Sequence, residues 1–265
     1  MTKGHRVEFS KRQRFIISVI ILSLLLFSSE HLFGKSGVYT IFSLAFLTDI
    51  LLFWTIRKDL KSLNSFQVFI LPFFYSLSFG LFYFLIPARF LTRILMTSLY
   101  AVGLYSLLLS MNIFVVSSIR TIALLSSART VSLALSLLSF FFLSNVTFSL
   151  HINIVITLLL MFGFSFFLIL QSIWVYTLDK QDKQLPSRIL WVGMIATCLT
   201  EVSFVLWFFP TNPTIIAVFL TGFFYIVVGL SQIWFERRLF RNVMWEYIWV
   251  AVIVFLIFVV FTIKS

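Results

Sequence analysis

Cysteine is almost absent from this sequence, because Cys198 is the only one in 265 residues. A single cysteine excludes an internal disulfide bond and a zinc site built from cysteine ligands. Cys198 lies inside a long hydrophobic run, so we expect it to be a small, buried apolar side chain.

Charge is also scarce, and acidic charge most of all. Charged residues make up 11% of the chain, with only 9 Asp and Glu against 20 Lys and Arg, while 61% of the residues are hydrophobic. This balance, with a mean hydropathy of +1.08, excludes an ordinary soluble domain. The net charge of +11 does not indicate nucleic acid, because the cations lie at the ends of hydrophobic runs, where they face lipid headgroups.

The sequence lacks the common catalytic signatures. It contains no H-E-x-x-H, no G-x-S-x-G, no glycine-rich phosphate loop and no paired-aspartate motif for magnesium. We therefore expect no metal and no cofactor, and a non-enzymatic role is favoured over an enzymatic one.

Long hydrophobic runs occupy most of the chain. A helix needs roughly 20 apolar residues to cross the hydrocarbon core of a bilayer. Nine runs meet this requirement: Phe15–Leu32, Val38–Ile56, Phe66–Ile86, Phe90–Val116, Val131–Leu150, Ile152–Leu178, Ile189–Phe209, Thr214–Phe235 and Val243–Ile263. The sequence predicts an all-α, polytopic membrane bundle in which a basic arm (1–14) precedes a single transmembrane domain (15–265).

The basic residues alternate between the two sides of these spans. With the N-terminus in the cytoplasm, 16 Lys and Arg fall on the inner side, and only Lys35, Arg89, Arg93 and Lys264 fall on the outer side. Short cytoplasmic loops carry the excess of Lys and Arg. We therefore predict an N-in, C-out topology in a cytoplasmic-type cell membrane.

The sequence leaves two features of the organisation open, and helix packing explains a third. The stretch Ser117–Thr130 is compatible with a loop, a helical extension or an interfacial helix. Nine spans do not form simple paired halves, although one helix beside two four-helix halves is possible. Small residues recur in pairs, and close packing between helices accounts for them without a site: Ser76/Gly80, Ser106/Ser110, Ser132/Ser136 and Gly222/Gly229.

Two carboxyl groups lie inside predicted spans, where ionisable groups are costly and need a reason. Asp49 is about 10 Å from the inner edge and Glu201 about 12 Å from the outer edge, at 1.5 Å per residue. Gly193, Thr197 and Glu201 recur every four residues and share one helix face. This polar stripe predicts contact with another helix or a cavity, and Gln171, at the depth of Asp49, is the hypothetical hydrogen-bond partner of that carboxyl.

Other polar residues gather at the predicted outer face. Arg89 and Arg93 share a face at the start of their span, which predicts an anion site; Arg93 would either reach Glu201 or extend to the headgroups. Glu30, His31 and His151 map to outer span ends. They are a candidate metal or proton-entry cluster, although solvated residues at span ends are the expected interpretation.

Three classes of function fit these residues. A transporter of small solutes or lipid-like molecules would use Asp49, Glu201 and the polar stripe, and this class is narrowly favoured. A membrane enzyme acting on a lipid or polyprenyl phosphate would hold the phosphate with Arg89 and Arg93 and use Glu201 as an acid or base. An accessory or scaffold subunit would need only a helix surface for a partner. The expected partners are the bilayer, a small-molecule or lipid ligand and a partner subunit.

Overall fold

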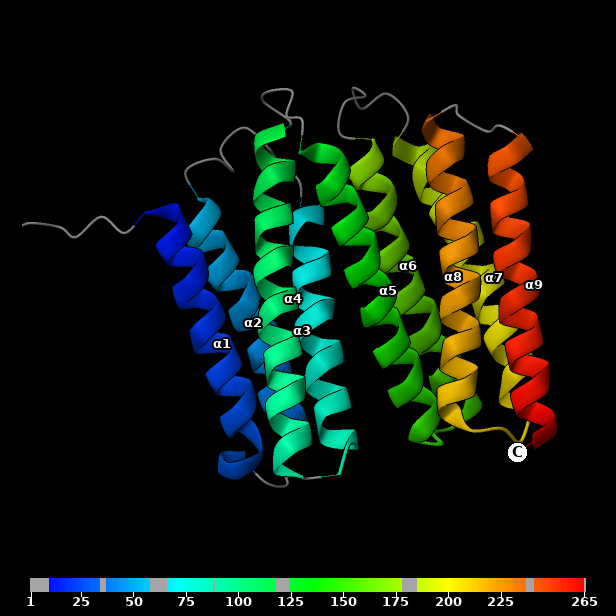
Figure 1. The fold of residues 1–265 in the computed structure, drawn as a ribbon, viewed down its shortest axis with the longest axis horizontal. Helices are drawn as coiled ribbons and strands as arrows, with labels where there is room; N and C mark the ends of the chain where they lie inside the picture. The colour runs from blue at the N-terminus through cyan, green and yellow to red at the C-terminus, as the bar shows by residue number, and fades with distance from the viewer. Residues whose placement is uncertain are drawn as a thin grey trace, which may run out of the picture.

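The computed structural model of the chain describes residues 10–33, 37–57, 66–87, 89–117, 124–177, 185–236 and 241–264. Within these residues all regular structure is helical, and nine helices lie side by side (Figure 1). Their bounds are α1 Lys11–Phe33, α2 Gly37–Ile56, α3 Gln67–Leu85, α4 Phe90–Ser117, α5 Leu125–Ser149, α6 Ile154–Tyr176, α7 Leu185–Trp207, α8 Pro213–Glu236 and α9 Arg241–Lys264. Each of the nine is long and apolar enough to cross a membrane, so the chain is a multi-pass membrane protein.

The first helix begins before the predicted span. Ser10 and Gln13 form a capping box, in which the Ser10 N–H donates to Gln13 Oε1 (2.9 Å) and the Gln13 N–H donates to Ser10 Oγ (3.4 Å). Helix α1 therefore starts at Lys11, and the last residues of the predicted arm 1–14 form its first turn. Residues 1–9 of that arm lie outside the described residues. The Arg14 guanidinium lies 5.3 Å from the centre of the Trp54 ring and links α1 to α2.

Helix α5 begins six residues before its predicted start, at Leu125. Ala128 is buried there, and the Arg129 guanidinium lies 4.9 Å from the centre of the Tyr176 ring on α6. These contacts stabilise an extra turn. The sequence left the structure of Ser117–Thr130 open. In this stretch Ser117 ends α4, and residues 125–130 belong to α5. Residues 118–123 lie outside the described part of the chain.

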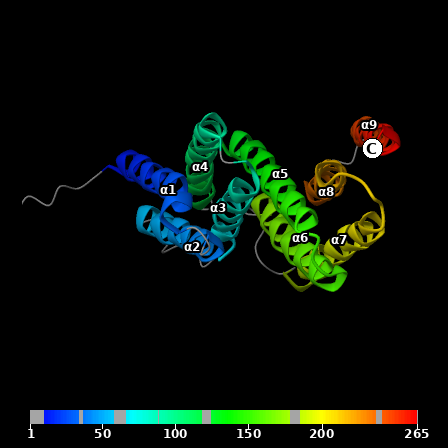
Figure 2. The same ribbon diagram turned by 90° about the horizontal axis from the view of Figure 1, so that it is seen from below.

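The helices form two four-helix units and one additional helix. In the first unit, α1 packs against α2 and α4, and α3 packs against α2 and α4; α5 to α8 repeat this pattern of contacts in the same order. Contacts of α3 and α4 with α5, and of α3 with α6, join the two units, while α9 packs against α8 (Figure 2). The arrangement is therefore one helix beside two four-helix halves.

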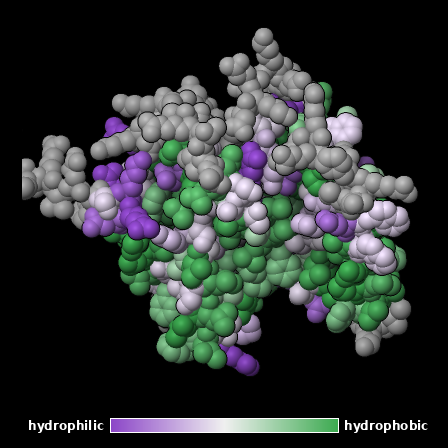
Figure 3. Space-filling view, turned by 45° about the horizontal axis from the view of Figure 1, so that its top comes forward, coloured by the Kyte–Doolittle hydropathy of each residue, from purple (hydrophilic) through white to green (hydrophobic). Residues whose placement is uncertain are grey.

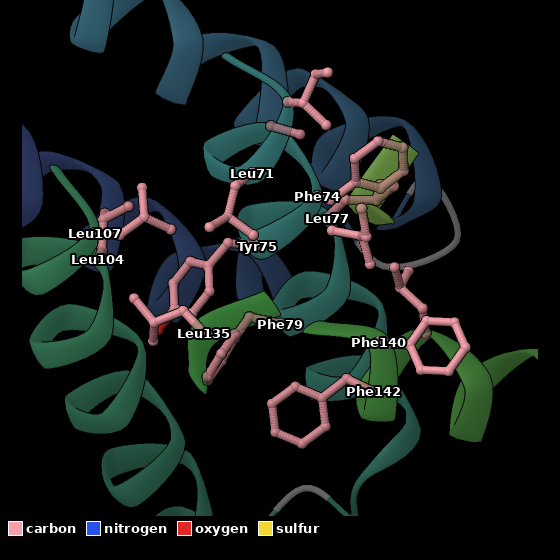
Figure 4. Close-up of a cluster of buried hydrophobic side chains, with 14 of the residues drawn as sticks. Leu71, Phe74, Tyr75, Leu77, Phe79, Leu104, Leu107, Leu135, Phe140 and Phe142 are labelled. Atoms are coloured by element: carbon pink, nitrogen blue, oxygen red, sulfur yellow. The ribbon is translucent and has the colours of Figure 1, made fainter. Parts of the chain in front are cut away.

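Aromatic side chains fill the junction between the two units (Figure 4). Tyr75 of α3 stacks on Tyr100 of α4 with ring centres 5.7 Å apart, and Phe79 of α3 meets the edge of Phe142 of α5 at 4.8 Å. The Tyr75 hydroxyl donates to the backbone oxygen of Tyr100 (3.2 Å). Such offset and edge-to-face pairs stabilise the junction beyond simple area burial.

Small residues let neighbouring helices approach closely, as the sequence predicts. A Cβ atom on Gly80 would come 2.6 Å from Ile41 of α2. On α8, a Cβ atom on Gly222 would lie 2.6 Å from Val254 of α9, and one on Gly229 would lie 2.5 Å from Tyr247 of α9. The two glycines of α8 therefore form the seam that holds α9.

Successive helices run in opposite directions, so basic residues collect at one end of the bundle. We call the end where the odd-numbered helices begin the basic end, and the other the opposite end. The described basic residues at the basic end are Lys11, Arg12, Arg14, Arg57, Arg129, Arg188 and Arg241. Hydrophilic residues gather towards this end above an apolar body (Figure 3). Which end faces the cytoplasm stays a prediction.

The turn between α5 and α6 contains an unusual backbone conformation. His151 has a φ of 47°, in the left-handed region, directly after the C-cap residue Leu150. Glycine is the usual residue here, because a side chain in this conformation costs about 1 kcal/mol or more. The turn therefore keeps a histidine where the backbone favours glycine.

We predict that Gly222→Ala lowers the thermal stability of the protein in detergent. The new methyl group would meet Cγ2, Cγ1 and Cβ of Val254 at 2.6, 2.7 and 3.2 Å, so rotating the valine cannot clear it and α9 must shift. Overpacking of this kind costs about 1–3 kcal/mol. Gly163→Ala is the control, since its Cβ would have no neighbour within 4 Å. Equal melting temperatures for the two variants would contradict the claim that Gly222 allows α9 to pack closely against α8.

We predict that His151→Gly raises the stability by roughly 0.5–1 kcal/mol, because glycine adopts the left-handed conformation without strain. Leu150→Gly is the matched control and should destabilise, since Leu150 has an ordinary helical φ of −76°. Thermal unfolding of both variants in detergent measures the difference. A lower melting temperature for His151→Gly than for the wild type would refute the proposed strain.

Candidate functional site

Asp49 lies on the seam between α2 and α3. On its own helix it is flanked by Phe46 and Phe53, which contact Phe73 and Phe69 of α3 with ring centres 5.2 and 6.5 Å apart. The carboxyl is half-buried, and its Oδ1 atom is buried without a hydrogen-bond partner in the described chain. The preceding residue, Thr48, points into the first unit and joins a buried hydrogen-bonded group.

That buried group links three helices of the first unit. The hydroxyls of Thr48 on α2 and Ser76 on α3 lie 2.8 Å apart, and Ser76 Oγ lies 2.9 Å from the Tyr100 hydroxyl on α4. All three side chains are fully buried. Since each oxygen has a neighbour to bond, the group is structural and does not include Asp49.

Gln171 is not the partner of Asp49, so that hypothesis was wrong. Gln171 is fully buried on α6, where its Nε2 donates to Ser132 Oγ of α5 (3.3 Å) and its Oε1 has no partner in the described chain. Helix α6 packs against α3, α5, α7 and α8, whereas α2 packs against α1 and α3. The predicted equal depth of the two residues therefore did not imply that they are neighbours, because their helices do not pack against each other.

The stripe on α7 faces outwards. Thr197 and Glu201 are exposed, and a Cβ atom on Gly193 would have no neighbour within 4 Å. Cys198 is exposed on the same helix, so the expectation that it is buried was wrong. The Thr197 hydroxyl donates to the Met194 backbone oxygen of its own helix (2.8 Å), and Glu201 makes no hydrogen bond or ion pair within the described residues. The helix or cavity expected to meet this stripe is therefore not found in the described part of this chain.

The two arginines begin α4 at the opposite end. The Arg93 N–H donates to the Arg89 backbone oxygen (3.1 Å), which places both residues in the first turn. Arg89 is exposed, whereas Arg93 is half-buried and lines a small recess with Tyr83 and Thr92. The alternative in which Arg93 reaches Glu201 is not realised, because α4 and α7 belong to different units and make no substantial contact.

The structure does not assemble the outer-face cluster either. Glu30 and His31 belong to α1, in the first unit, and their side chains lie outside the described residues. His151 follows α5 in the second unit, and α1 makes no substantial contact with α5 or α6. Among the described residues no group of three His, Cys, Asp or Glu side chains is arranged to hold a metal.

The second unit contains a cavity that sequence analysis missed. It has a volume of about 290 Å³ and lies at the opposite end, between the turn from α5 to α6 and the turn from α7 to α8. We call it the cup; its lining comprises Thr147, Phe148, His151, Thr157, Trp207, Phe208, Phe209, Pro210, Thr211, Pro213 and Ile216. The Pro-rich turn and His151 are visible in the sequence, but only the packing of α5 against α6 and α8, and of α7 against α6 and α8, brings them together.

Comparison with known proteins identifies the family of this chain but no activity. Neither the curated proteins nor the solved structures give a match to this chain. One family model, described as a protein of unknown function (DUF5656), matches residues 17–261 and so runs from α1 into α9. The chain belongs to the DUF5656 family.

Proposed function

We propose that this protein is an assembly subunit of a membrane complex, and that the outward face of α7 binds a transmembrane helix of a partner. The observation that supports this role is the polar stripe Gly193, Thr197 and Glu201, which lies within a predicted span and makes no side-chain hydrogen bond to another helix in the described chain. Of the three classes open from the sequence, the accessory or scaffold subunit explains this surface best.

The physical reason is the cost of a carboxyl group in hydrocarbon. A charged side chain near the bilayer centre costs about 2.5–3.5 kcal/mol on translocon scales. Glu201 lies six residues before the end of α7, about 9 Å from that end at 1.5 Å per residue. A partner helix would remove the carboxyl from lipid and give it a hydrogen-bond partner.

The neighbours of the stripe suit a helix contact. Gly193 has open space where a side chain would stand, which allows a second backbone to approach closely. Leu190, Met194 and Phe204 are exposed and lie near the stripe on the same side of α7. This face thus combines a small residue, a hydrogen-bonding carboxyl and apolar flanks, the composition expected of a membrane helix interface.

A transport site formed jointly by the two carboxyls receives less support. Asp49 belongs to the first unit and Glu201 faces outwards from the second. Aromatic rings of Tyr75, Phe79 and Phe142 fill the junction between the units. A transporter that used both carboxyls would need a path through this packed junction.

We predict that Glu201→Leu reduces assembly without lowering the stability of the subunit. The wild type, purified in mild detergent, should have a protein mass well above 30.8 kDa, from a second copy or from a stoichiometric partner. The variant should be predominantly monomeric, because leucine replaces a carboxyl that the partner satisfies with a side chain suited to lipid. Light scattering coupled to size exclusion, with mass spectrometry of the eluted polypeptides, measures both effects.

Glu246→Leu is the matched control, since Glu246 is also exposed but lies on α9. Its assembly should equal that of the wild type. A monomeric wild type without a co-purifying partner would rule out the assembly role, and so would an unchanged complex in the Glu201→Leu variant.

A second candidate role, binding of a phosphate-bearing lipid, is supported by the arginine pair on α4. Cations in the first turn of a helix oppose its dipole, so Arg89 and Arg93 are placed at some electrostatic cost. An anion at this point would interact favourably with both side chains and with the helix N-terminus. This geometry is the basis for the enzyme alternative, in which the arginines hold a lipid or polyprenyl phosphate.

We predict that the double variant Arg89→Ala/Arg93→Ala retains fewer anionic lipids than the wild type. Native mass spectrometry after purification with added phosphatidylglycerol measures the lipid molecules that stay bound. The control is Arg57→Ala/Arg188→Ala, which removes the same charge from the basic end. Equal lipid retention in the two double variants would show that net charge, rather than this pair, governs binding.

A further inference from the structure

The walls of the cup are held in place by polar contacts near its rim. Asn145 of α5 donates through Nδ2 to Thr214 Oγ1 of α8 (3.1 Å), and Ser149 Oγ donates to Asn145 Oδ1 (3.3 Å). The side chain of Asn153 caps α6, and that of Asn212 accepts from the Thr214 N–H at the start of α8 (3.0 Å). Both turns that line the cup are thus fixed by side chains, which is the usual condition for a pre-formed binding site.

The polar groups of the cup offer mainly lone pairs. His151 Nδ1 lies 2.9 Å from the Ser149 backbone oxygen, which can only accept, so in the neutral ring Nδ1 carries the proton and Nε2 is an acceptor. Thr147 donates its hydroxyl hydrogen to Leu143 O (2.7 Å), and Thr157 donates to Ile152 O (3.5 Å). Their oxygens keep free lone pairs.

Donors are few in the same lining. The described lining contains no Lys or Arg, and Pro210 and Pro213 have no backbone N–H. The side-chain donors are the Trp207 indole N–H and the Thr211 hydroxyl, whose oxygen is buried without a hydrogen-bond partner. A ligand that brings its own N–H or O–H donors fits this lining better than an anion does.

Aromatic side chains complete the cup. Trp207, Phe208 and Phe209 line one side, and Phe148 of α5 also contributes to the lining. Tryptophan and phenylalanine faces attract cations through their quadrupole, most strongly when water is excluded. An acceptor-rich, aromatic cavity without a competing cation is the environment that binds an organic ammonium group.

We propose that the cup binds a primary ammonium group, carried either by a small soluble amine or by the headgroup of an amine-bearing lipid. A primary ammonium has three N–H donors for His151 Nε2 and the threonine oxygens, whereas a quaternary ammonium has none. The volume of about 290 Å³ fits a small amine or a headgroup and is too small for a large substrate. This site is separate from the α7 stripe and does not depend on the assembly role.

The test is a calorimetric titration of the full chain, in detergent at about pH 8, with ethylammonium chloride. We expect saturable binding at one site, and binding at least about tenfold weaker for tetramethylammonium. A second arm measures retention of phosphatidylethanolamine against phosphatidylglycerol by native mass spectrometry. Binding of ethylammonium alone identifies a soluble amine as the ligand class, and selective retention of phosphatidylethanolamine identifies a lipid headgroup.

Three variants test the lining itself. His151→Gly removes the imidazole while relieving the backbone, so a loss of binding there cannot be attributed to unfolding. Trp207→Leu removes the largest aromatic wall. Each should weaken binding about tenfold, and Thr157→Val should weaken it by a smaller factor.

The controls match these changes outside the cup. Trp249→Leu removes an exposed tryptophan of α9, and Thr221→Val removes a threonine of α8 that also bonds its own helix. Both should bind like the wild type. The proposal is overturned if neither ethylammonium nor phosphatidylethanolamine binds, if tetramethylammonium binds equally well, or if the controls lose as much affinity as the cup variants.

Discussion

A polar group inside a bilayer must find its hydrogen-bond partner within the protein, and the structure depends on how this chain meets that requirement. In the described residues, most serine and threonine hydroxyls donate to a carbonyl one turn earlier on their own helix, as Thr147, Ser203 and Thr221 do. Each helix can then present these hydroxyls to lipid or to another helix without an unpaired donor. The choice of which helices pack together must therefore come from a small number of other contacts.

Those contacts are of two kinds. A few hydrogen bonds cross between helices, including the Thr48–Ser76–Tyr100 group in the first unit and the Asn145–Thr214 bond in the second. Glycines provide the second kind, since they let α3 approach α2 and α8 approach α9. Because lipid tails are as apolar as leucine, close packing and these hydrogen bonds, rather than hydrophobic burial, select which helices are neighbours.

Two places where polar atoms keep hydrogen-bonding capacity without a partner are those where we propose function. Glu201 faces outwards with no partner in the described chain, and we assign it a partner helix. The cup keeps free lone pairs at His151 and two threonines, and we assign it an ammonium group. Asp49, with one buried and unpartnered oxygen, has no assigned role.

The sequence alone predicted the nine helices found in the described residues, their approximate ends, and the positions of Asp49 and Glu201 along their helices, because hydrophobic length and helical rise are properties of a single segment. It also determined that Gly193, Thr197 and Glu201 share a face. Only the tertiary structure decided that this face points outwards, that Gln171 bonds Ser132, and that His151 joins Trp207 in a cup. The position of a residue along a membrane helix follows from the length of that helix and the thickness of the bilayer. The lateral position of a helix and its rotation about its own axis depend on contacts with helices far apart in the chain.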